Sequence, residues 1–238
     1  MKNFIKKKLK SILYFIELNF KIKIANKSPI DIYLDKVSQD SYEFFKKDIN
    51  KSSSFTNDED IRHYSISRAF KNINNNNNIF LEFGVYKGVS TKLFAKFLSH
   101  YDLEIYGFDS FEGLEEDWIA SDYNPIGTFS LKKKHFKMPK NVKIIEGKIQ
   151  DTLDDFLKSN LDKKIIFVHM DMDTYTPTKY ALNKIKPFLQ KGSIILFDEF
   201  YGFPNWQNHE YKALKETFKE EEYKYFAFGN RQVSIEIL

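Results

Sequence analysis

Cysteine is absent from this chain of 238 residues, and its absence excludes several kinds of chemistry. Disulfides, Cys-based metal sites and every mechanism that needs a thiolate nucleophile are ruled out. The basic N-terminal segment holds no long apolar run, because its longest, Ile12 to Ile16, is far too short to span a bilayer. No small-residue cleavage site follows, so we expect no signal peptide. With 42% hydrophobic residues, the chain can bury one full core and a small extension.

Charge is unevenly distributed along the chain. Residues 1–30 hold eight Lys against one Glu, so the remainder carries about −3 of a net charge of +4. This slightly acidic body predicts no nucleic-acid partner. Apolar residues in Met1–Ile24 recur as on one helical face. This segment either makes peripheral contact with an anionic membrane surface, or it packs on the fold or on a homodimer partner. We prefer packing to membrane contact. We expect a cytoplasmic protein, with any membrane contact at the inner surface.

Strands and helices alternate through most of the chain. The predicted strands cover residues 79–83, 103–108, 142–146, 165–170 and 193–198. The predicted helices cover residues 60–70, 89–99, 151–159, 177–189 and 208–219. This alternation predicts an α/β fold with a Rossmann-like, doubly wound, mostly parallel sheet, and apolar segments around Gly229-Asn230 predict a closing antiparallel hairpin. We therefore divide the chain into a basic helical extension or lid, residues 1–70, and a ligand-binding domain, residues 71–238.

The stretch from residue 80 to residue 91 carries the most informative motif. An apolar run ends in Glu82, Gly84 and Gly88 follow, and Ser90 opens a helical pattern. Glycine lets the backbone approach a ligand closely and adopt positive φ. Ser90 would lie at a helix N-terminus, where free N–H groups favour a carboxylate or phosphate. The charge of Glu82 suits an ammonium group, so the motif favours S-adenosylmethionine over a dinucleotide, the alternative being an ordinary βα turn.

A second acid follows at a suitable distance. Asp109 ends the next predicted strand, 21 residues beyond Gly88. In doubly wound folds an acid at this position accepts hydrogen bonds from the ribose hydroxyls, so we assign Asp109 and its neighbour Ser110 to the cofactor site. The alternative is a helix cap or loop residue. The dinucleotide pattern Gly-x-Gly-x-x-Gly is absent, which again favours S-adenosylmethionine over NAD.

Four more acids follow the next two predicted strands. They are Asp171, Asp173, Asp198 and Glu199. Because ligands in open α/β sheets bind at the carboxyl ends of strands, we expect these side chains near the adenosyl site. Crowded carboxylates repel unless protons or a cation compensate, and oxygen ligands suit Mg²⁺, Mn²⁺ or Ca²⁺. The alternative is that some of them cap helices or pair with Lys. His169 is interpreted as a core histidine.

Several segments together resemble the macrocin O-methyltransferase family of class I S-adenosylmethionine-dependent enzymes. The resemblance runs from about residue 60 to the C-terminus and rests on LEFGVYKGVST, IYGFDSFEGLEEDW, NVKIIEGKIQDTL, HMDMDTY, GSIILFDEF and GNRQV. It implies Mg²⁺-dependent methylation of sugar hydroxyls. It also implies that Glu82, Gly84 and Gly88 surround the methionine moiety, while Asp109 holds the ribose.

The resemblance also implies the remaining ligands. Ile149 and Gln150 resemble the adenine-contacting turn of catechol-type O-methyltransferases. Asp171, Asp198 and Glu199 align with the metal ligands of those relatives. The third ligand there is usually Asp or Asn, so Glu199 is a departure that bears on metal dependence.

The acceptor pocket and the proton acceptor are harder to assign. Trp118 and the aromatic-rich segment 201–210 suit a sugar ring or another flat acceptor, or they are packed surface loops. His209 and Asp171 are the predicted catalytic residues. We predict an O-methyltransferase that acts on a sugar or a glycosylated small molecule in polysaccharide or natural-product biosynthesis. The alternatives are an NAD-dependent oxidoreductase and a non-catalytic adenosyl-binding assembly protein.

Overall fold

The computed structural model describes residues 9–12, 14, 27–71, 73, 77–131 and 137–238. Most of the basic segment 1–24 lies outside the described residues, so its predicted helix, its membrane contact and its role in a homodimer stay predictions. No described helix is long and apolar enough to cross a membrane.

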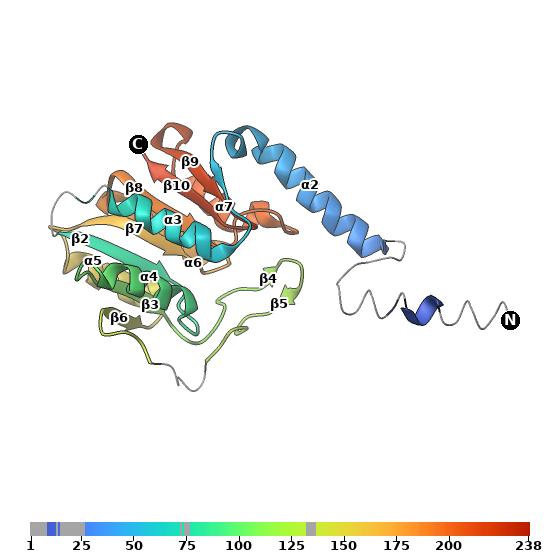
Figure 1. Cartoon of the computed structure of the whole chain (residues 1–238). Helices are drawn as coiled ribbons and strands as arrows, with labels where there is room; N and C mark the ends of the chain where they lie inside the picture. The colour runs from blue at the N-terminus through green and yellow to red at the C-terminus, as the bar shows by residue number, and fades with distance from the viewer. Residues whose placement is uncertain (1–8, 13, 15–26, 72, 74–76, 132–136) are drawn as a thin grey trace.

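One sheet of eight strands forms the centre of the fold (Figure 1). Its strands follow the order β1-β9-β10-β8-β7-β2-β3-β6. Their bounds are β1 Ser53–Ser54, β2 Asn78–Phe83, β3 Ile105–Asp109, β6 Val142–Glu146, β7 Lys164–Met170, β8 Leu189–Phe197, β9 Tyr223–Phe228 and β10 Val233–Ile237. The strands from β8 to β6 are parallel, whereas β10 runs antiparallel to β8 and β9. The predicted parallel sheet with a closing hairpin is confirmed.

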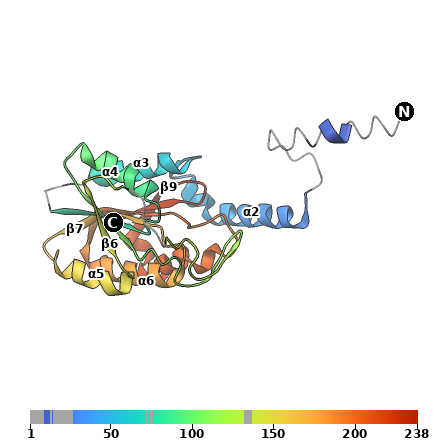
Figure 2. The same cartoon turned by 90° about the horizontal axis from the view of Figure 1, so that it is seen from below.

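Helices cover both faces of this sheet. Figure 2 shows α3 and α4 on one face, α5 and α6 on the other, and α2 extending beyond the edge of the sheet. Their bounds are α2 Pro29–Ile49, α3 Asp58–Phe70, α4 Val89–Ser99, α5 Ile149–Lys158, α6 Tyr175–Ile185 and α7 Glu210–Thr217. Helix α7 packs beside α6. The predicted doubly wound arrangement is therefore confirmed.

Side chains of the central strands point alternately to the two faces of the sheet, and each face has its own hydrophobic core. In β2, Leu81 and Phe83 belong to the core under α5 and α6, while Phe80 belongs to the core under α3 and α4. Successive side chains of a strand point to opposite faces, so Glu82 faces the α3 side, as Phe80 does. In β7 the same alternation gives His169 the face of Phe167. This parity decides which polar side chains meet at the end of the sheet.

Two differences from the predicted elements have local causes. The predicted helix 177–189 ends at Ile185, and a 3-10 turn over Lys186–Phe188 leads directly into β8. Pro187 lacks the N–H that a continued α-helix needs. The loop after β3 contains a small hairpin that was not predicted, β4 Trp118–Ile119 and β5 Tyr123–Asn124.

The segment before residue 71 contacts the sheet directly. Strand β1 pairs with β9, and Phe45 of α2 is buried in the larger core. Helix α3 buries Ile61, Ile66 and Ala69 against β7 and β8. The boundary at residue 70 stays a prediction, and residues 45–70 contribute to the packing of the main fold.

Candidate functional site

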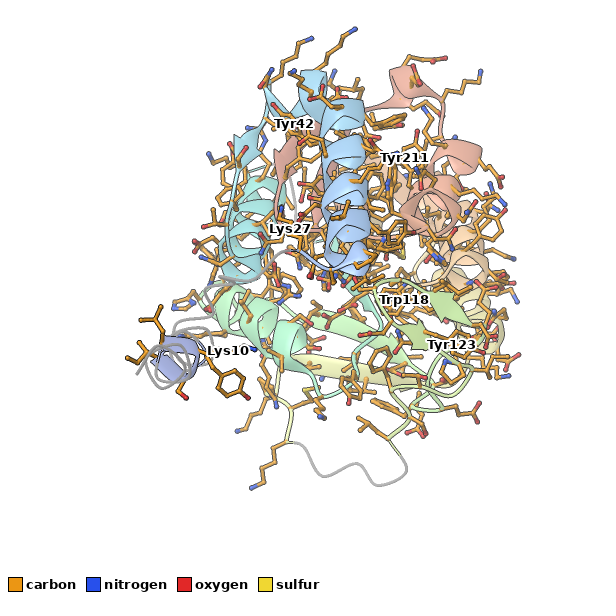
Figure 3. All side chains as sticks on the ribbon, turned by 90° about the vertical axis from the view of Figure 1, so that its right-hand side faces the viewer. Lys10, Lys27, Tyr42, Trp118, Tyr123 and Tyr211 are labelled. Carbon is orange, nitrogen blue, oxygen red and sulfur yellow. The ribbon has the colours of Figure 1, made fainter. Side chains whose placement is uncertain are left out.

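A cavity of about 370 Å³ opens at the carboxyl ends of the parallel strands. Its lining residues come from both predicted motifs, from the acids and from the loop after β3: Gly84, Tyr86, Phe108, Asp109, Ser110, Gly113, Leu114, Glu115, Trp118, Phe129, Gly147, Lys148, Ile149, Asp171, Met172, Asp173, Pro177, Asp198 and Glu199. Figure 3 shows the labelled Trp118 on the green β4–β5 segment, below the blue helix α2. Seven of the predicted site residues therefore share one cavity.

Gly84 occupies the closest approach between two strand ends. Its φ is +88°, and a Cβ at this position would lie 1.7 Å from the backbone oxygen of Asp171. The Gly84 N–H donates to the Phe108 carbonyl oxygen at 2.9 Å, while the Asp171 N–H donates to the Phe83 carbonyl oxygen at 2.8 Å. Only glycine fits here, because both the conformation and the space exclude a side chain. The backbone of the turn after β2 is thereby in direct contact with the backbone that follows β7.

Asp109 fixes that turn from the β3 side. Its Oδ2 accepts the N–H groups of Val85 at 2.8 Å and Tyr86 at 2.6 Å, and its Oδ1 accepts the N–H of Phe111 at 2.6 Å. Oδ1, which accepts one N–H, keeps a second lone pair, so the group can still accept a hydroxyl from the cavity. The sequence predicted a ribose acceptor, and the structure adds a role in holding the loop.

The other predicted cofactor residues divide into two sets. Ser110 and Ile149 line the cavity. Gln150 lies just behind it and donates to Glu115 Oε2 at 2.7 Å. Gly88 and Ser90 lie outside the lining, at the start of α4, where Gly88 has a φ of +70° and abuts Met138. The predicted strand–turn–helix motif is present. Its turn at Gly84 lines the cavity, whereas the start of the helix at Gly88 and Ser90 does not.

Asp171 and Asp173 face the cavity from the end of β7. Among the described residues, no hydrogen bond reaches either carboxyl group. Burial raises the pKa of Asp171 well above its usual range, and Asp198 and Asp173 add to the shift. Burial, followed by Glu199 and Asp198, raises the pKa of Asp173 to about 8. Asp173 also has a φ of +61°, a strained conformation for a residue with a side chain.

Asp198 contrasts with its neighbours because its charge is compensated. Its Oδ1 accepts from Arg62 Nη2 at 2.7 Å, from His169 Nε2 at 3.1 Å and from Gln232 Nε2. Burial alone would raise the pKa of Asp198, but His169 and Arg62 outweigh it and hold the pKa well below its usual range. Glu199, by contrast, has Arg231 at 3.3 Å, and burial raises its pKa to about 7.

His169 lies between two carboxylates. Its Nδ1 is 3.0 Å from Glu82 Oε1 and its Nε2 is 3.1 Å from Asp198 Oδ1, with all three groups on the α3 side. Burial opposes the charge on the ring, yet the hydrogen bonds with Asp198 and Glu82 raise the pKa of His169. Because a nitrogen that donates has no lone pair for a metal, this ring is a poor ligand, although it groups geometrically with Asp171 and Asp198. Glu82 itself is buried beside the cavity, outside its lining.

The acids fit a divalent cation by their chemistry. Asp171, Asp173 and Glu199 offer oxygen ligands, and Asp198 keeps Oδ2 free of described hydrogen bonds. Burial first, and the neighbouring acids after it, raise the pKa values of the first three, so their charged forms need a compensating cation. Oxygen-only donor sets suit Mg²⁺ or Mn²⁺. The predicted set of Asp171, Asp198 and Glu199 lines the same cavity, with Asp173. Of this set, Asp171 and Asp198 bring ligand atoms within 4.8 Å of each other, and Glu199 does not belong to that close group.

His209 lies outside the cavity lining. Its Nε2 is 3.1 Å from Asn205 Nδ2 and 3.4 Å from the Ile119 carbonyl oxygen, and its ring stacks on Phe203. Burial lowers the pKa of His209. These contacts join the aromatic segment 201–210 to the β4–β5 hairpin, and the assignment of His209 as a base stays a prediction.

Three site residues were not predicted. Arg62, Gln232 and Arg231 contact the acids from elements that are distant in sequence. No local signal assigns them to the site, because they meet the acids through the pairing of β10 with β8 and the packing of α3. Asp173, predicted with the other acids near the adenosyl site, does line the cavity.

Comparisons with known proteins agree with this geometry. A family model described as "Methyltransferase domain" matches residues 81–200, about half of the chain. No curated protein matches the sequence. A structure of CalS11, a calicheamicin methyltransferase, is 20% identical with a TM-score of 0.61 and covers 89% of this chain and 94% of its own.

Two further solved structures are similar in fold. An apo structure of CalS11, titled as a TDP-rhamnose 3'-O-methyltransferase of calicheamicin biosynthesis, is 21% identical with a TM-score of 0.56 and covers 89% of this chain and 96% of its own. The O-methyltransferase NovP is 17% identical with a TM-score of 0.54 and covers 87% of this chain and 99% of its own.

Proposed function

The chain belongs to the methyltransferase-domain family and is a class I S-adenosylmethionine-dependent methyltransferase. On that premise we propose that it methylates a hydroxyl of a sugar or of a glycosylated small molecule, in polysaccharide or natural-product biosynthesis. The observation that carries the proposal is the cavity itself. Its lining joins the turn at Gly84 and Asp109 to the carboxyl groups of Asp171 and Asp173, which have no hydrogen-bond partner among the residues that the structure describes.

The β2–β3 side of the cavity suits S-adenosylmethionine. Asp109 Oδ1 would accept a ribose hydroxyl, and Ile149, with Gly147 and Phe108, would pack against the adenine ring. Glu82 lies buried beside the cavity, where a carboxylate favours the ammonium group of the methionine moiety. Gly84 leaves room for that moiety to lie close to the backbone.

The acidic side suits an alcohol as acceptor. The hydroxyl oxygen attacks the methyl carbon of the sulfonium, the new O–C bond forms as the C–S bond breaks, and S-adenosylhomocysteine leaves. The hydroxyl proton must pass to a base, and Asp171 and Asp173 are carboxyl groups at the cavity with no described hydrogen-bond partner. An unprotonated carboxylate there both orients the hydroxyl and takes its proton.

The same acids can hold a divalent cation. Bound by Asp171, Asp198 and Glu199, Mg²⁺ would lower the pKa of the acceptor hydroxyl. A cation bound beside Asp173 would also lower the raised pKa of that carboxyl group and so leave it able to accept a proton.

Aromatic side chains form the acceptor side of the cavity. Trp118, Phe129 and Tyr86 line it, and the Trp118 indole N–H is buried without a partner among the described residues. Aromatic faces pack against the apolar faces of sugar rings, and an unpaired N–H can donate to a ring hydroxyl. CalS11, whose apo structure is titled as a TDP-rhamnose methyltransferase, has the same fold. A sugar-containing acceptor is therefore the proposed substrate class.

An acceptor screen tests this function. The purified protein is incubated with S-adenosylmethionine, Mg²⁺ and a panel of nucleotide sugars, glycosylated small molecules, free phenols and amines. Formation of S-adenosylhomocysteine and of a product heavier by one CH₂ is measured by mass spectrometry. We expect methylation of a sugar hydroxyl. Transfer to amines or phenols, with none to any sugar, would contradict the proposal.

The family match disfavours the NAD-dependent oxidoreductase, and the acids at the cavity argue against a non-catalytic binding protein. A cytoplasmic location, a homodimer and contact of residues 1–24 with the inner membrane surface remain proposals that rest on the basic N-terminal segment.

A further inference from the structure

Three donors converge on one oxygen of Asp198. Arg62 Nη2 lies 2.7 Å from Oδ1, His169 Nε2 lies 3.1 Å from it, and Gln232 Nε2 contacts it as well. The side chains of Arg62 and Asp198 are only 16% and 15% exposed, and Gln232 is 1% exposed. Such a cluster of donors fixes both the position and the rotation of the carboxylate.

The donors come from three separate parts of the chain. His169 lies in β7, Gln232 directly precedes β10, and Arg62 belongs to α3, the helix on that face of the sheet. Both Arg62 and Gln232 lie outside residues 81–200, the range that the family model matches. Segments on either side of that range thus meet on a single side chain of the cavity.

This arrangement leaves the second oxygen of Asp198 free. Among the described residues, all hydrogen bonds to the carboxylate reach Oδ1, while Asp198 lines the cavity. Groups that hydrogen-bond to a metal ligand set its orientation, and their loss typically weakens metal binding or activity. Arg62 is suited to this role because its charge is permanent and its donors are fixed in a plane.

We propose that Arg62, assisted by Gln232, is a positioning residue that holds Asp198 with Oδ2 presented to a divalent cation at the acceptor side. The inference rests on the proposed function, because it assigns the cation to that same site. It predicts that helix α3 contributes to the active centre as well as to the core.

Helix α3 provides a matched control. Arg68 contacts Glu236 of β10 with Nη2 at 2.9 Å and Nε at 3.2 Å. This pair joins α3 to β10, the neighbour of β8 in the sheet, and it lies outside both the cavity and the acids. Arg68→Met therefore removes an ion pair between α3 and the sheet without touching Asp198.

The test measures Mn²⁺ binding by electron paramagnetic resonance, in the presence of saturating S-adenosylhomocysteine. Arg62→Met should weaken Mn²⁺ binding by roughly 10- to 100-fold. Arg62→Lys should lose less, because the charge remains. Arg68→Met should bind Mn²⁺ as the wild type does. Calorimetric affinity for S-adenosylhomocysteine should stay unchanged in all three variants, which separates a local effect on Asp198 from a general loss of structure.

Gln232→Leu gives a second test should Arg62→Met fail to fold. Gln232 Oε1 has no partner among the described residues, so an apolar side chain removes an unpaired acceptor together with the donor. We expect weaker Mn²⁺ binding at a thermal midpoint close to that of the wild type. If Arg62→Met binds Mn²⁺ as tightly as the wild type, the inference about Arg62 is overturned while the proposed function stands. If Arg62→Met does not fold, wild-type Mn²⁺ affinity in Gln232→Leu has the same meaning. A wild type that binds S-adenosylhomocysteine but no Mn²⁺ would overturn both the inference and the cation site. A wild type that binds neither would overturn the proposed function itself.

Discussion

The two sides of the cavity differ in how their acids are satisfied. At the ends of β2 and β3, Asp109 accepts three backbone N–H groups at 2.6 to 2.8 Å. At the end of β7, Asp171 and Asp173 have no hydrogen-bond partner among the described residues, and burial raises the pKa of both, whereas Asp198 after β8 is held by three donors. The β2–β3 side is complete in itself, but the two acids after β7 need a proton, a cation or a substrate.

This difference matches the tasks that we assign to the two sides. A binding surface gains affinity when it is rigid before the ligand arrives, and backbone hydrogen bonds supply that rigidity. A catalytic carboxylate gains from being unpaired and buried, because it can then take a proton or a cation from the substrate side. The comparison therefore predicts that mutations on the two sides have different consequences.

The largest effect is expected at Gly84, where the two sides meet. Gly84→Ala places a Cβ within 1.7 Å of the Asp171 backbone oxygen at a φ of +88°. We expect loss of S-adenosylhomocysteine binding and a large fall in thermal stability. Gly127→Ala is the control, because its φ is +83° but its Cβ would meet only the Glu112 oxygen at 3.9 Å. The control should lose only about 1–2 kcal/mol from the conformation itself. Equal behaviour of the two variants would argue against the close approach.

Asp171→Asn tests the acidic side alone. It removes a candidate proton acceptor and metal ligand, so we expect turnover to fall by roughly 10²- to 10⁴-fold. Affinity for S-adenosylhomocysteine should remain nearly intact. The exposed Asp162 offers a control, since Asp162→Asn should leave turnover unchanged. Turnover is measured as methyl transfer to the acceptor found in the screen, and retained turnover would remove Asp171 from the mechanism.

Asp109→Asn tests the satisfied side. The amide nitrogen cannot accept a hydrogen bond, and bonds to a charged group contribute roughly 1.5–3 kcal/mol each. We expect the free energy of unfolding to fall by about 2 kcal/mol. Asp102→Asn is the control, because Asp102 has a φ of +56° that Asn adopts readily. Chemical denaturation of both variants gives the comparison, and an unchanged Asp109→Asn would show that the loop does not depend on these bonds.

The last expected effect is a dependence of stability on pH. Burial and neighbouring acids raise the pKa of Asp173 from 3.8 to about 8, so the folded state keeps a proton that the unfolded state has already released. Stability should therefore fall as the pH rises between these two values. Asp173→Asn should flatten the fall, and Mg²⁺ should reduce it in the wild type. Thermal midpoints from pH 5 to pH 8 measure this, and identical slopes in the variant and the wild type would count against an uncompensated Asp173.

The sequence predicted the sheet well because its strands are continuous apolar runs. The predicted strands 79–83, 142–146 and 165–170 each lie within one residue of the observed bounds. The predicted helix 177–189 extends beyond the observed end at Ile185, because Pro187 cannot continue an α-helix. The β4–β5 hairpin was missed because strands of two residues leave no periodic pattern.

For the site, the acids were predictable and their partners were not. Asp109, Asp171 and Asp198 follow predicted strands, and strand ends meet at one edge of the sheet. The contacts of Arg62 and Gln232 with Asp198 depend on the face of the sheet to which each side chain points. The Arg62 contact also depends on the packing of helix α3, because Arg62 lies 136 residues before Asp198. No local pattern contains that information.

The most direct test is calorimetric titration of S-adenosylhomocysteine into the wild type, Asp109→Asn and Asp171→Asn, with NAD as a control ligand. The two-sided account predicts binding to the wild type and to Asp171→Asn, weaker binding to Asp109→Asn, and no heat with NAD. Loss of binding in Asp171→Asn with full binding in Asp109→Asn would contradict the account, because the adenosyl ligand would then depend on the acidic side.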